Sequence, residues 1–296
     1  MSTTDNKANK AIVADAAGAA VLLPDLLDLP AKQARFERIY RDAMLERRED
    51  LRDGIGLLGE KWQHQIIKRY LTEDPREHEV KLAGTRFVSD VRVGNAIYEV
   101  QTGSFAPMKK KLERYFADPS LTVTVVHPLP AVRHLTWMDP ATGEFGKSRR
   151  VAGKRDPVLL LPALYPLIPL LSHVGTGRLS FRLLLLEVED FKLLDGKSRD
   201  RKHGATRLER IPVGLMDDLL FTSPSDFAAL LPPSLPSPLT VAGLSRATGL
   251  QGLDAYSAAR SLVALGILAP SVPISRAMAF EVVRGEGKTL EGEGPP

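Results

Sequence analysis

The sequence predicts an α/β protein with a smaller helical module near its C-terminal end, and three observations lead to this class. Apolar residues recur at steps of three and four through residues 51–71, which indicates an amphipathic helix. Strand-like runs and a second amphipathic stretch follow, at 78–82, 85–93, 96–102, 105–117 and 121–127. Residues 239–283 then show the pattern of a helix, a turn, a second helix and a strand.

Glycine, asparagine and proline residues indicate where these elements end. Residues 31–50 are charged and helical in pattern. Asp74–Pro75 ends the helix over 51–71, because the residue before a proline disfavours helical backbone. Gly84 and Gly94–Asn95 mark tight turns between the first strands.

The pattern becomes less regular after the strand over 121–127. Pro128 and Pro130 are expected to close that strand, since proline cannot donate to a sheet. A hairpin over 132–151, with its tip at 140–143, is expected next. A short broken helix or packed loop, a buried strand and a basic loop follow, at 158–171, 179–189 and 192–210.

Composition excludes several classes of protein. The 296 residues include no cysteine, so disulfides and zinc–thiolate sites are excluded. No window of 18 uninterrupted apolar residues and no signal-peptide layout occurs, so a cytoplasmic protein without a membrane span is expected. The net charge of +4 permits nucleic-acid binding without arguing for it. The chain has neither a Walker loop nor a G-x-S-x-G elbow.

One predicted hairpin carries the residues that point to chemistry. Asp90 lies near the end of one strand, and Glu99 and Gln101 lie on the next. A turn at Gly94–Asn95 makes the two strands antiparallel, so Asp90 falls opposite Glu99. Glu99 and Gln101 share a face because side chains alternate along a strand. Two converging carboxylates form a hard-oxygen site that suits Mg²⁺ or Mn²⁺.

Ordinary surface polarity is the alternative for both parts of this constellation. Acidic residues on a hairpin are often solvated, but Glu99 lies inside the otherwise apolar run AIYEVQT, where a charge needs a partner or a function. Glu60, His64 and Lys68 form one polar stripe on the preceding helix. The stripe is either a solvated helix face, or it lies over the sheet with Glu60 as a third carboxylate and Lys68 as a phosphate contact.

The segment 51–127 resembles the core of the PD-(D/E)XK nuclease superfamily, a restriction-endonuclease-like fold with the order α-β-β-β-α-β. It also looks like an uncharacterised bacterial branch with the pattern E-x-x-x-H-x-x-x-K, D, E-[IV]-Q-T and K-L. The matching residues are Glu60, His64, Lys68, Asp90, Glu99 to Thr102, and Lys111–Leu112. The resemblance implies that Asp90, Glu99 and the Val100 carbonyl hold Mg²⁺ or Mn²⁺, with Glu60 in support.

Two departures from the superfamily pattern affect the expected activity. Ser89 stands where the superfamily name implies proline, and Gln101 replaces the usual catalytic lysine. A neutral amide can orient water but supplies no charge to the transition state. Among Lys109, Lys110 and Lys111 on the following helix, Lys111 is favoured as the replacement. The alternative is that these lysines form only a solvated basic face and that the core is inactive.

Several basic residues are candidate nucleic-acid contacts, and an ordinary solvated role remains open for each. The run 192–210 is rich in Lys and Arg with interspersed acids, so a phosphate-tracking loop and a plain surface loop are about equally favoured. The candidate contacts are Lys68, Arg69, Lys109, Lys110, Arg199, Arg201, Lys202 and Arg260.

The expected domain division has four parts: a disordered leader, a nuclease-like domain, a winged helix-turn-helix and a disordered tail, at 1–30, 31–215, 216–284 and 285–296. The second helix of the winged helix, 253–264, offers few base-reading side chains, with Arg260 the main candidate. DNA docking by shape and a protein–protein role, including a homodimer, therefore stay equally open.

The sequence thus favours a Mg²⁺-dependent nuclease that hydrolyses phosphodiester bonds in DNA. The alternative is a catalytically inactive nuclease-fold protein that acts as a DNA-binding or protein-interaction module. Retained Asp90 and Glu99 favour the enzyme, and Gln101 favours the alternative. The choices between DNA and RNA, and between internal and terminal cleavage, stay open.

Overall fold

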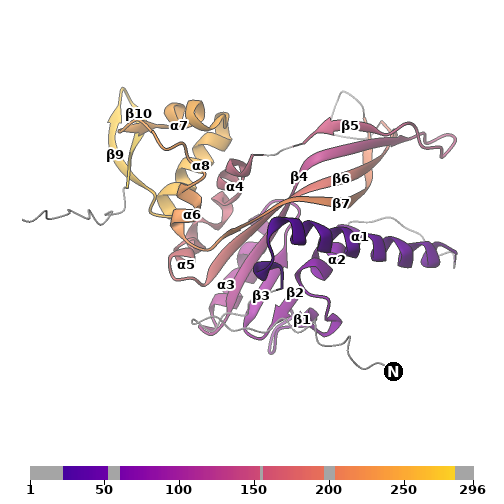
Figure 1. The fold of residues 1–296 in the computed structure, drawn as a ribbon. Helices are drawn as coiled ribbons and strands as arrows, with labels where there is room; N and C mark the ends of the chain where they lie inside the picture. The colour runs from indigo at the N-terminus through magenta and orange to yellow at the C-terminus, as the bar shows by residue number, and fades with distance from the viewer. Residues whose placement is uncertain (1–22, 53–60, 154–155, 197–203, 284–296) are drawn as a thin grey trace, which may run out of the picture. The chain divides into compact units, whose positions relative to one another are not determined.

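The computed structural model describes residues 23–52, 61–153, 156–196 and 204–283 and has a mixed α/β architecture (Figure 1). The chain divides into two compact units. The first comprises the described parts of Met1–Pro157 and Arg178–Phe221, and the second those of Val158–Gly177 and Thr222–Pro296. The expected boundary at 215/216 falls inside a strand that continues to Phe221.

A seven-stranded mixed sheet forms the first unit, with the strand order β1-β2-β3-β4-β6-β7 and β5 paired to β4. Pairing is parallel between β3 and β4 and between β4 and β6, and antiparallel elsewhere. The strands are β1 His78–Lys81, β2 Val88–Val93, β3 Ala96–Val100, β4 Thr122–Met138, β5 Arg149–Ala152, β6 Leu179–Leu193 and β7 Thr206–Phe221.

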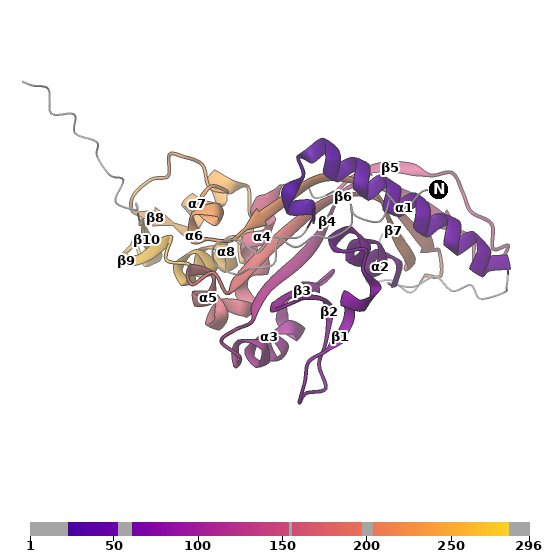
Figure 2. The same cartoon turned by 60° about the horizontal axis from the view of Figure 1, so that its bottom comes forward.

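Helices cover both faces of this sheet near β3. The helical elements are η1 Leu23–Leu26, α1 Leu29–Arg52, α2 Lys61–Leu71, η2 Pro75–Glu77, η3 Ala106–Met108 and α3 Lys109–Phe116. In Figures 1 and 2, α1 runs alongside β7. Tyr98 and Val100 of β3 join the core that α1 and α2 form with Phe36, Ile66 and Tyr70. Since side chains alternate along a strand, Glu99 points to the opposite face, where α3 lies.

The expected order of helix, three strands, helix and strand is confirmed as α2, β1, β2, β3, α3 and β4. The expected helix over 51–71 is represented by α2 from Lys61, and α1 ends at Arg52. Residues 53–60, which include Glu60, lie outside the described residues.

The expectation that Pro128 and Pro130 close their strand is wrong, because β4 continues to Met138. The pairing explains why. β3 pairs with β4 only as far as Val126, and β5 begins to pair at Val132, so between them β4 has only β6 beside it. Residues at alternate positions of a strand direct their N–H groups to the same side. Pro128 and Pro130 therefore lack N–H groups only on the side without a neighbour, where no ladder bond is lost.

The expectation of a basic loop over 192–210 is also wrong at both ends. β6 runs to Leu193 and β7 begins at Thr206, while residues 197–203 lie outside the described residues. Three register shifts against β6 interrupt β7. Each bulge breaks the period of two by which a strand is recognised in a sequence.

The second unit combines short helices with a three-stranded antiparallel sheet of order β8-β10-β9. Prolines divide residues 157–175 into short helical pieces, as expected for the broken segment. The elements are η4 Pro157–Leu159, α4 Leu160–Ala163, η5 Tyr165–Leu170, α5 Ser172–Gly175, α6 Pro224–Ala228, β8 Leu239–Thr240, α7 Val241–Thr248, α8 Gly252–Ala264, β9 Leu268–Ile274 and β10 Ala277–Val282.

The turn between α7 and α8 follows from its sequence. Thr240 caps α7 by accepting a hydrogen bond from the Gly243 N–H at 3.1 Å. Gly249 ends the helix with a φ of 75°, a conformation that glycine adopts without a Cβ penalty. After this turn α8 covers the expected second helix over 253–264.

A buried ion network fastens α1 and α2 to the sheet of the first unit. Arg182 of β6 is 1% exposed and donates to both carboxylate oxygens of Asp218 on β7. The Tyr70 hydroxyl donates to Asp218 Oδ2 at 2.6 Å, and the Lys32 ammonium lies 3.3 Å from the same oxygen. Arg182 also donates to Asp25 at 2.6 Å. Burial opposes ionisation of Asp218, but Arg182, Tyr70 and Lys32 together hold the pKa of Asp218 below its ordinary value.

Asp218→Asn should destabilise the protein by about 3–5 kcal/mol, because it leaves the Arg182 charge buried without its carboxylate. Since the folded-state pKa of Asp218 is depressed, its contribution is present above the ordinary aspartate pKa and is lost as pH falls through the folded-state pKa. Urea unfolding at several pH values measures both effects. The exposed Asp42→Asn serves as control and should cost less than about 1 kcal/mol. Equal losses for the two variants would contradict the assignment.

Candidate functional site

The β2–β3 hairpin brings Asp90 and Glu99 together as the sequence predicted. The register pairs Val91 with Tyr98 and Val93 with Ala96, and its continuation places Asp90 opposite Glu99. Gly94, with a φ of 58°, makes the turn. Directly opposite residues of antiparallel strands project from the same face. Asp90 Oδ2 accepts the Val100 N–H at 2.7 Å, which fixes the carboxylate against the end of β3.

Helix α3 supplies two side chains to Glu99. The Lys111 ammonium donates to Glu99 Oε2 at 2.5 Å, and the Tyr115 hydroxyl donates to Oε1 at 2.7 Å. Lys111 and Tyr115 lie four residues apart and therefore on one face of the helix. Both oxygens of Glu99 are thus satisfied although the residue is only 4% exposed.

Burial sets the protonation of this carboxylate. Loss of solvent raises the pKa of Glu99 to about 7, the Lys111 charge acts against the rise, and the Asp90 charge adds to it. Glu99 therefore titrates near neutral pH even with the Lys111 ammonium beside it. A further cation at this place would favour its ionised form.

The end of β3 is held by two histidines. His64 of α2 donates from Nε2 to the Val100 carbonyl at 3.0 Å. His127 of β4 donates from Nδ1 to the Gln101 carbonyl at 2.6 Å. The Gln101 side chain donates to the Ser104 carbonyl at 2.7 Å. Its amide therefore braces the loop before α3 and makes no hydrogen bond to either carboxylate.

The donor set fits one hard cation with few protein ligands. Asp90 and Glu99 offer carboxylate oxygens on one face, and Mg²⁺ commonly takes one or two carboxylates and keeps several waters. Within the described ranges, no group of three or more His, Cys, Asp or Glu residues gathers as a metal site. Glu60, the expected supporting carboxylate, lies outside those ranges. The Val100 carbonyl keeps a second lone pair beside its hydrogen bond to His64.

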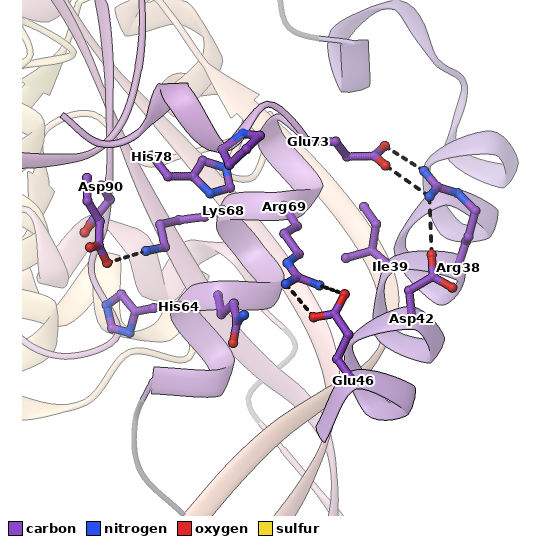
Figure 3. A pocket seen from close by; sticks show the side chains of 13 residues that line it. Arg38, Ile39, Asp42, Glu46, His64, Lys68, Arg69, Glu73, His78 and Asp90 are labelled. Carbon is purple, nitrogen blue, oxygen red and sulfur yellow. Dashed lines mark hydrogen bonds and ion pairs between the residues drawn. The ribbon is translucent and has the colours of Figure 1, made fainter. Parts of the chain in front are cut away.

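Asp90 also borders an open groove of about 970 Å³ between α1, α2, η2 and β1. Figure 3 shows His64, Lys68 and Asp90 at one end and Arg38, Asp42 and Glu73 at the other. The cations in it are paired: Lys68 with Glu79 at 2.8 Å, Arg69 with Glu46 at 2.7 Å, and Arg38 with Glu73 at 2.6 Å. Lys68 and Arg69, expected to contact phosphate, are therefore engaged by carboxylates.

The remaining expected contacts are scattered. Lys109 lies on α3 at 3.9 Å from Glu113, and Lys110 is exposed beside it. Arg260 is exposed on α8 in the second unit. Arg199, Arg201 and Lys202 lie outside the described residues. Of the expected site residues, the structure therefore brings Asp90, Glu99 and Lys111 together.

The sequence did not indicate the polar role of Tyr115, which lies in the amphipathic stretch over 105–117. The signal was present in the spacing, because Tyr115 lies one turn beyond Lys111. A buried tyrosine needs a partner for its hydroxyl, and Glu99 is the acceptor in reach. The sequence likewise indicated His127 only as the last residue of the strand over 121–127, with no polar role.

The fold and the site define a mixed α/β protein with two carboxylates paired across a central hairpin. A family model described as a domain of unknown function (DUF8091) matches residues 61–222, more than half of the chain. The chain belongs to that family. The match runs from the start of α2 to just past the end of β7 and so includes every strand of the large sheet.

The other comparisons give no further relatives. Neither the curated proteins nor the solved structures contain a match to this chain. Among the helices of the described ranges, none has the length and apolar character needed to cross a membrane.

Proposed function

We propose that this protein is a divalent-metal-dependent nuclease of the PD-(D/E)XK type that hydrolyses phosphodiester bonds in DNA. The observation that carries the proposal is the convergence of three residues. Asp90 and Glu99 lie opposite each other on one face of the hairpin, and α3 returns the Lys111 ammonium to Glu99. Two carboxylates with a lysine beside them form the combination that such chemistry needs.

Each residue has a separate role in this proposal. Asp90, Glu99 and the Val100 carbonyl would hold Mg²⁺ or Mn²⁺. The ion, when bound, would polarise the scissile phosphate and lower the pKa of an attacking water. Lys111 supplies positive charge near the phosphate in place of the missing lysine at Gln101. Tyr115 orients Glu99 by its hydrogen bond to Oε1.

Lys111 has a role in this proposal both in the metal-free site and in the site with metal bound. The Lys111 ammonium is 22% exposed and has a long, flexible stem. If Glu99 held a metal ion, the ion would take over the neutralising role of this ammonium, and Lys111 would then be able to reach the phosphate. In this proposal the salt bridge between Lys111 and Glu99 is the resting arrangement of the site.

The second unit supports a nucleic-acid role of the same protein. α7, α8 and the sheet β8-β10-β9 have the order and turn of a winged helix. Arg260 on α8, the candidate base contact, is exposed. We propose that this unit docks DNA by shape, since α8 has few other side chains that read bases.

A second candidate function is a nuclease-fold protein without catalysis that binds nucleic acid or another protein. Two interactions favour it. The Gln101 amide is committed to the Ser104 carbonyl, and Lys111 already neutralises Glu99 without a metal. In that case the site is a structural ion pair, and the groove beside Asp90 is a surface without chemistry.

The test is cleavage of labelled single-stranded and duplex DNA, with matching RNA, in the presence of Mg²⁺, Mn²⁺ or EDTA. The nuclease proposal expects products with Mg²⁺ or Mn²⁺ and none with EDTA. Absence of products from every substrate with both metals would reject it in favour of the inactive-core candidate. Cleavage of RNA alone would support the metal-dependent hydrolysis and show that the substrate is RNA and not DNA.

A further inference from the structure

The outer parts of β4, β5, β6 and β7 form a four-stranded region beyond the end of β3. One row crosses this region as Arg149, Leu135, Asp190 and Arg210, and a second as Trp137, Lys192 and Arg207. Figure 1 shows β5 beside the outer end of β4. Residues paired in register share a face of the sheet, so these two rows lie on the same face.

Charges in this region are divided between the two faces. One face, here called the basic face, carries a single carboxylate, Asp190, and five cations: Arg133, Arg149, Lys192, Arg207 and Arg210. The opposite face carries three carboxylates, Glu187, Glu189 and Glu209, with Arg150 and His134. An ordinary solvated surface interleaves both signs, whereas this region separates them.

Buried Asp190 organises two of the arginines. Arg133 donates to its Oδ2 at 2.6 Å, and Arg210 donates to Oδ1 at 2.6 Å and to Oδ2 at 2.9 Å. Asp190 is 0% exposed, and burial opposes its ionisation, but Arg210 and Arg133 hold its pKa below the ordinary value. One carboxylate thus positions two guanidinium groups. The side chains of Arg133 and Arg210 remain 27% and 19% exposed.

The other three cations on this face have no carboxylate partner among the described residues. Arg149 and Arg207 are exposed and make no hydrogen bond or ion pair with any residue that the structure describes. Lys192 places its ammonium 5.5 Å from the centre of the Trp137 ring. Arg149 and Arg210 are three strand spacings apart, which is about 14 Å. The face therefore offers separated positive groups over a width of several phosphates.

We propose that the basic face binds the phosphate backbone of a nucleic acid. Four of its five cations are arginine, whose planar guanidinium matches phosphate oxygens in pairs. Three of the five cations lie in the run 192–210, which the sequence offered as a phosphate-tracking loop, and the strand pairing adds Arg133 and Arg149 to them. It rests on the proposed function for the class of ligand, but binding here requires neither the metal nor Lys111.

The experiment measures binding of the full chain to short fluorescent duplex DNA in EDTA, where no metal-dependent cleavage occurs. The variant is Arg149→Gln/Arg207→Gln, which removes two exposed cations without a structural partner. The matched control is Arg150→Gln, the next residue of β5, which projects from the opposite face. Thermal unfolding checks that all three proteins are folded.

We expect the double variant to bind about tenfold more weakly at moderate salt. The slope of log affinity against log salt should fall by about 0.9 for each phosphate that the variant no longer neutralises. Arg150→Gln should bind like the parent. Parental binding by the double variant, or an equal weakening in Arg150→Gln, would overturn the proposal. So would weaker binding to anionic lipid vesicles while DNA binding is unchanged.

The proposed function can fail separately. Absence of cleavage with normal, salt-dependent binding on the basic face would reject the nuclease and leave this inference standing. Metal-dependent cleavage by the parent, with no effect of the double variant on binding, would support the nuclease and reject this inference.

Discussion

Asp90→Asn should lower the rate of metal-dependent cleavage by roughly 10³-fold, at the upper end of what removing one stabilising group costs. The amide keeps an oxygen that accepts the Val100 N–H, so the hairpin should remain folded. It removes the negative charge that would hold the metal. The effect is therefore on chemistry rather than on stability, and initial rates with Mg²⁺ measure it on labelled DNA.

The control for Asp90→Asn is Asp42→Asn, the same change at the far end of the groove. Asp42 is exposed and pairs only with Arg38 at 3.5 Å, so its variant should cleave like the parent. Isothermal titration with Mg²⁺ gives an independent readout, with heat expected from the parent and none from Asp90→Asn. A fully active Asp90→Asn protein would remove Asp90 from the metal site.

Lys111→Ala should reduce cleavage by about 10²–10³-fold, because the transition state loses the one cation that α3 brings to Glu99. Gln101→Ala should have a smaller effect, since the Gln101 amide contacts the Ser104 carbonyl and not the carboxylates. The Lys111 charge lowers the pKa of Glu99, so its removal should also shift the inflection of the pH–rate profile upward.

Arg114→Ala on the same helix is the control for Lys111→Ala, since Arg114 is exposed and Glu99 accepts its hydrogen bonds from Lys111 and Tyr115 instead. It should leave both rate and pH profile unchanged. A Lys111→Ala protein that cleaves normally while Gln101→Ala is inactive would show that the lysine has not migrated. A lower rate without a shift in the pH profile would show that Lys111 does not lower the pKa of Glu99 in the free enzyme.

The part of the site that the sequence predicted is the part that local chain geometry determines. The turn at Gly94–Asn95 fixes the register of its two strands, and the register fixes that Asp90 faces Glu99. Helix α3 starts only a few residues after β3, and the K-L pattern of the family that the segment resembles selected Lys111 among three neighbouring lysines. These inferences needed no pairing between distant segments.

The features that the sequence did not predict depend on pairing between distant segments. The continuation of β4 through Pro128 and Pro130 follows from which neighbours the strand has on each side. The second half of the sheet depends on β7, whose bulges conceal its period. The separation of charge on the basic face becomes visible only once residues from β4, β5, β6 and β7 are in register.

The buried hydrogen bonds of Arg182 also have a consequence for the order of folding. Arg182 bonds Asp25 across 157 residues of sequence, and Tyr70 bonds Asp218 across 148. Interactions this distant must wait for loop closure, which slows folding relative to a chain whose interactions are local. During synthesis α1, α2 and the strands β1 to β6 are made before Asp218, the carboxylate that bonds both Arg182 and Tyr70. The first unit therefore completes its core only after β7 has left the ribosome, and a nascent chain that stops short of it exposes the surface on which α1 packs.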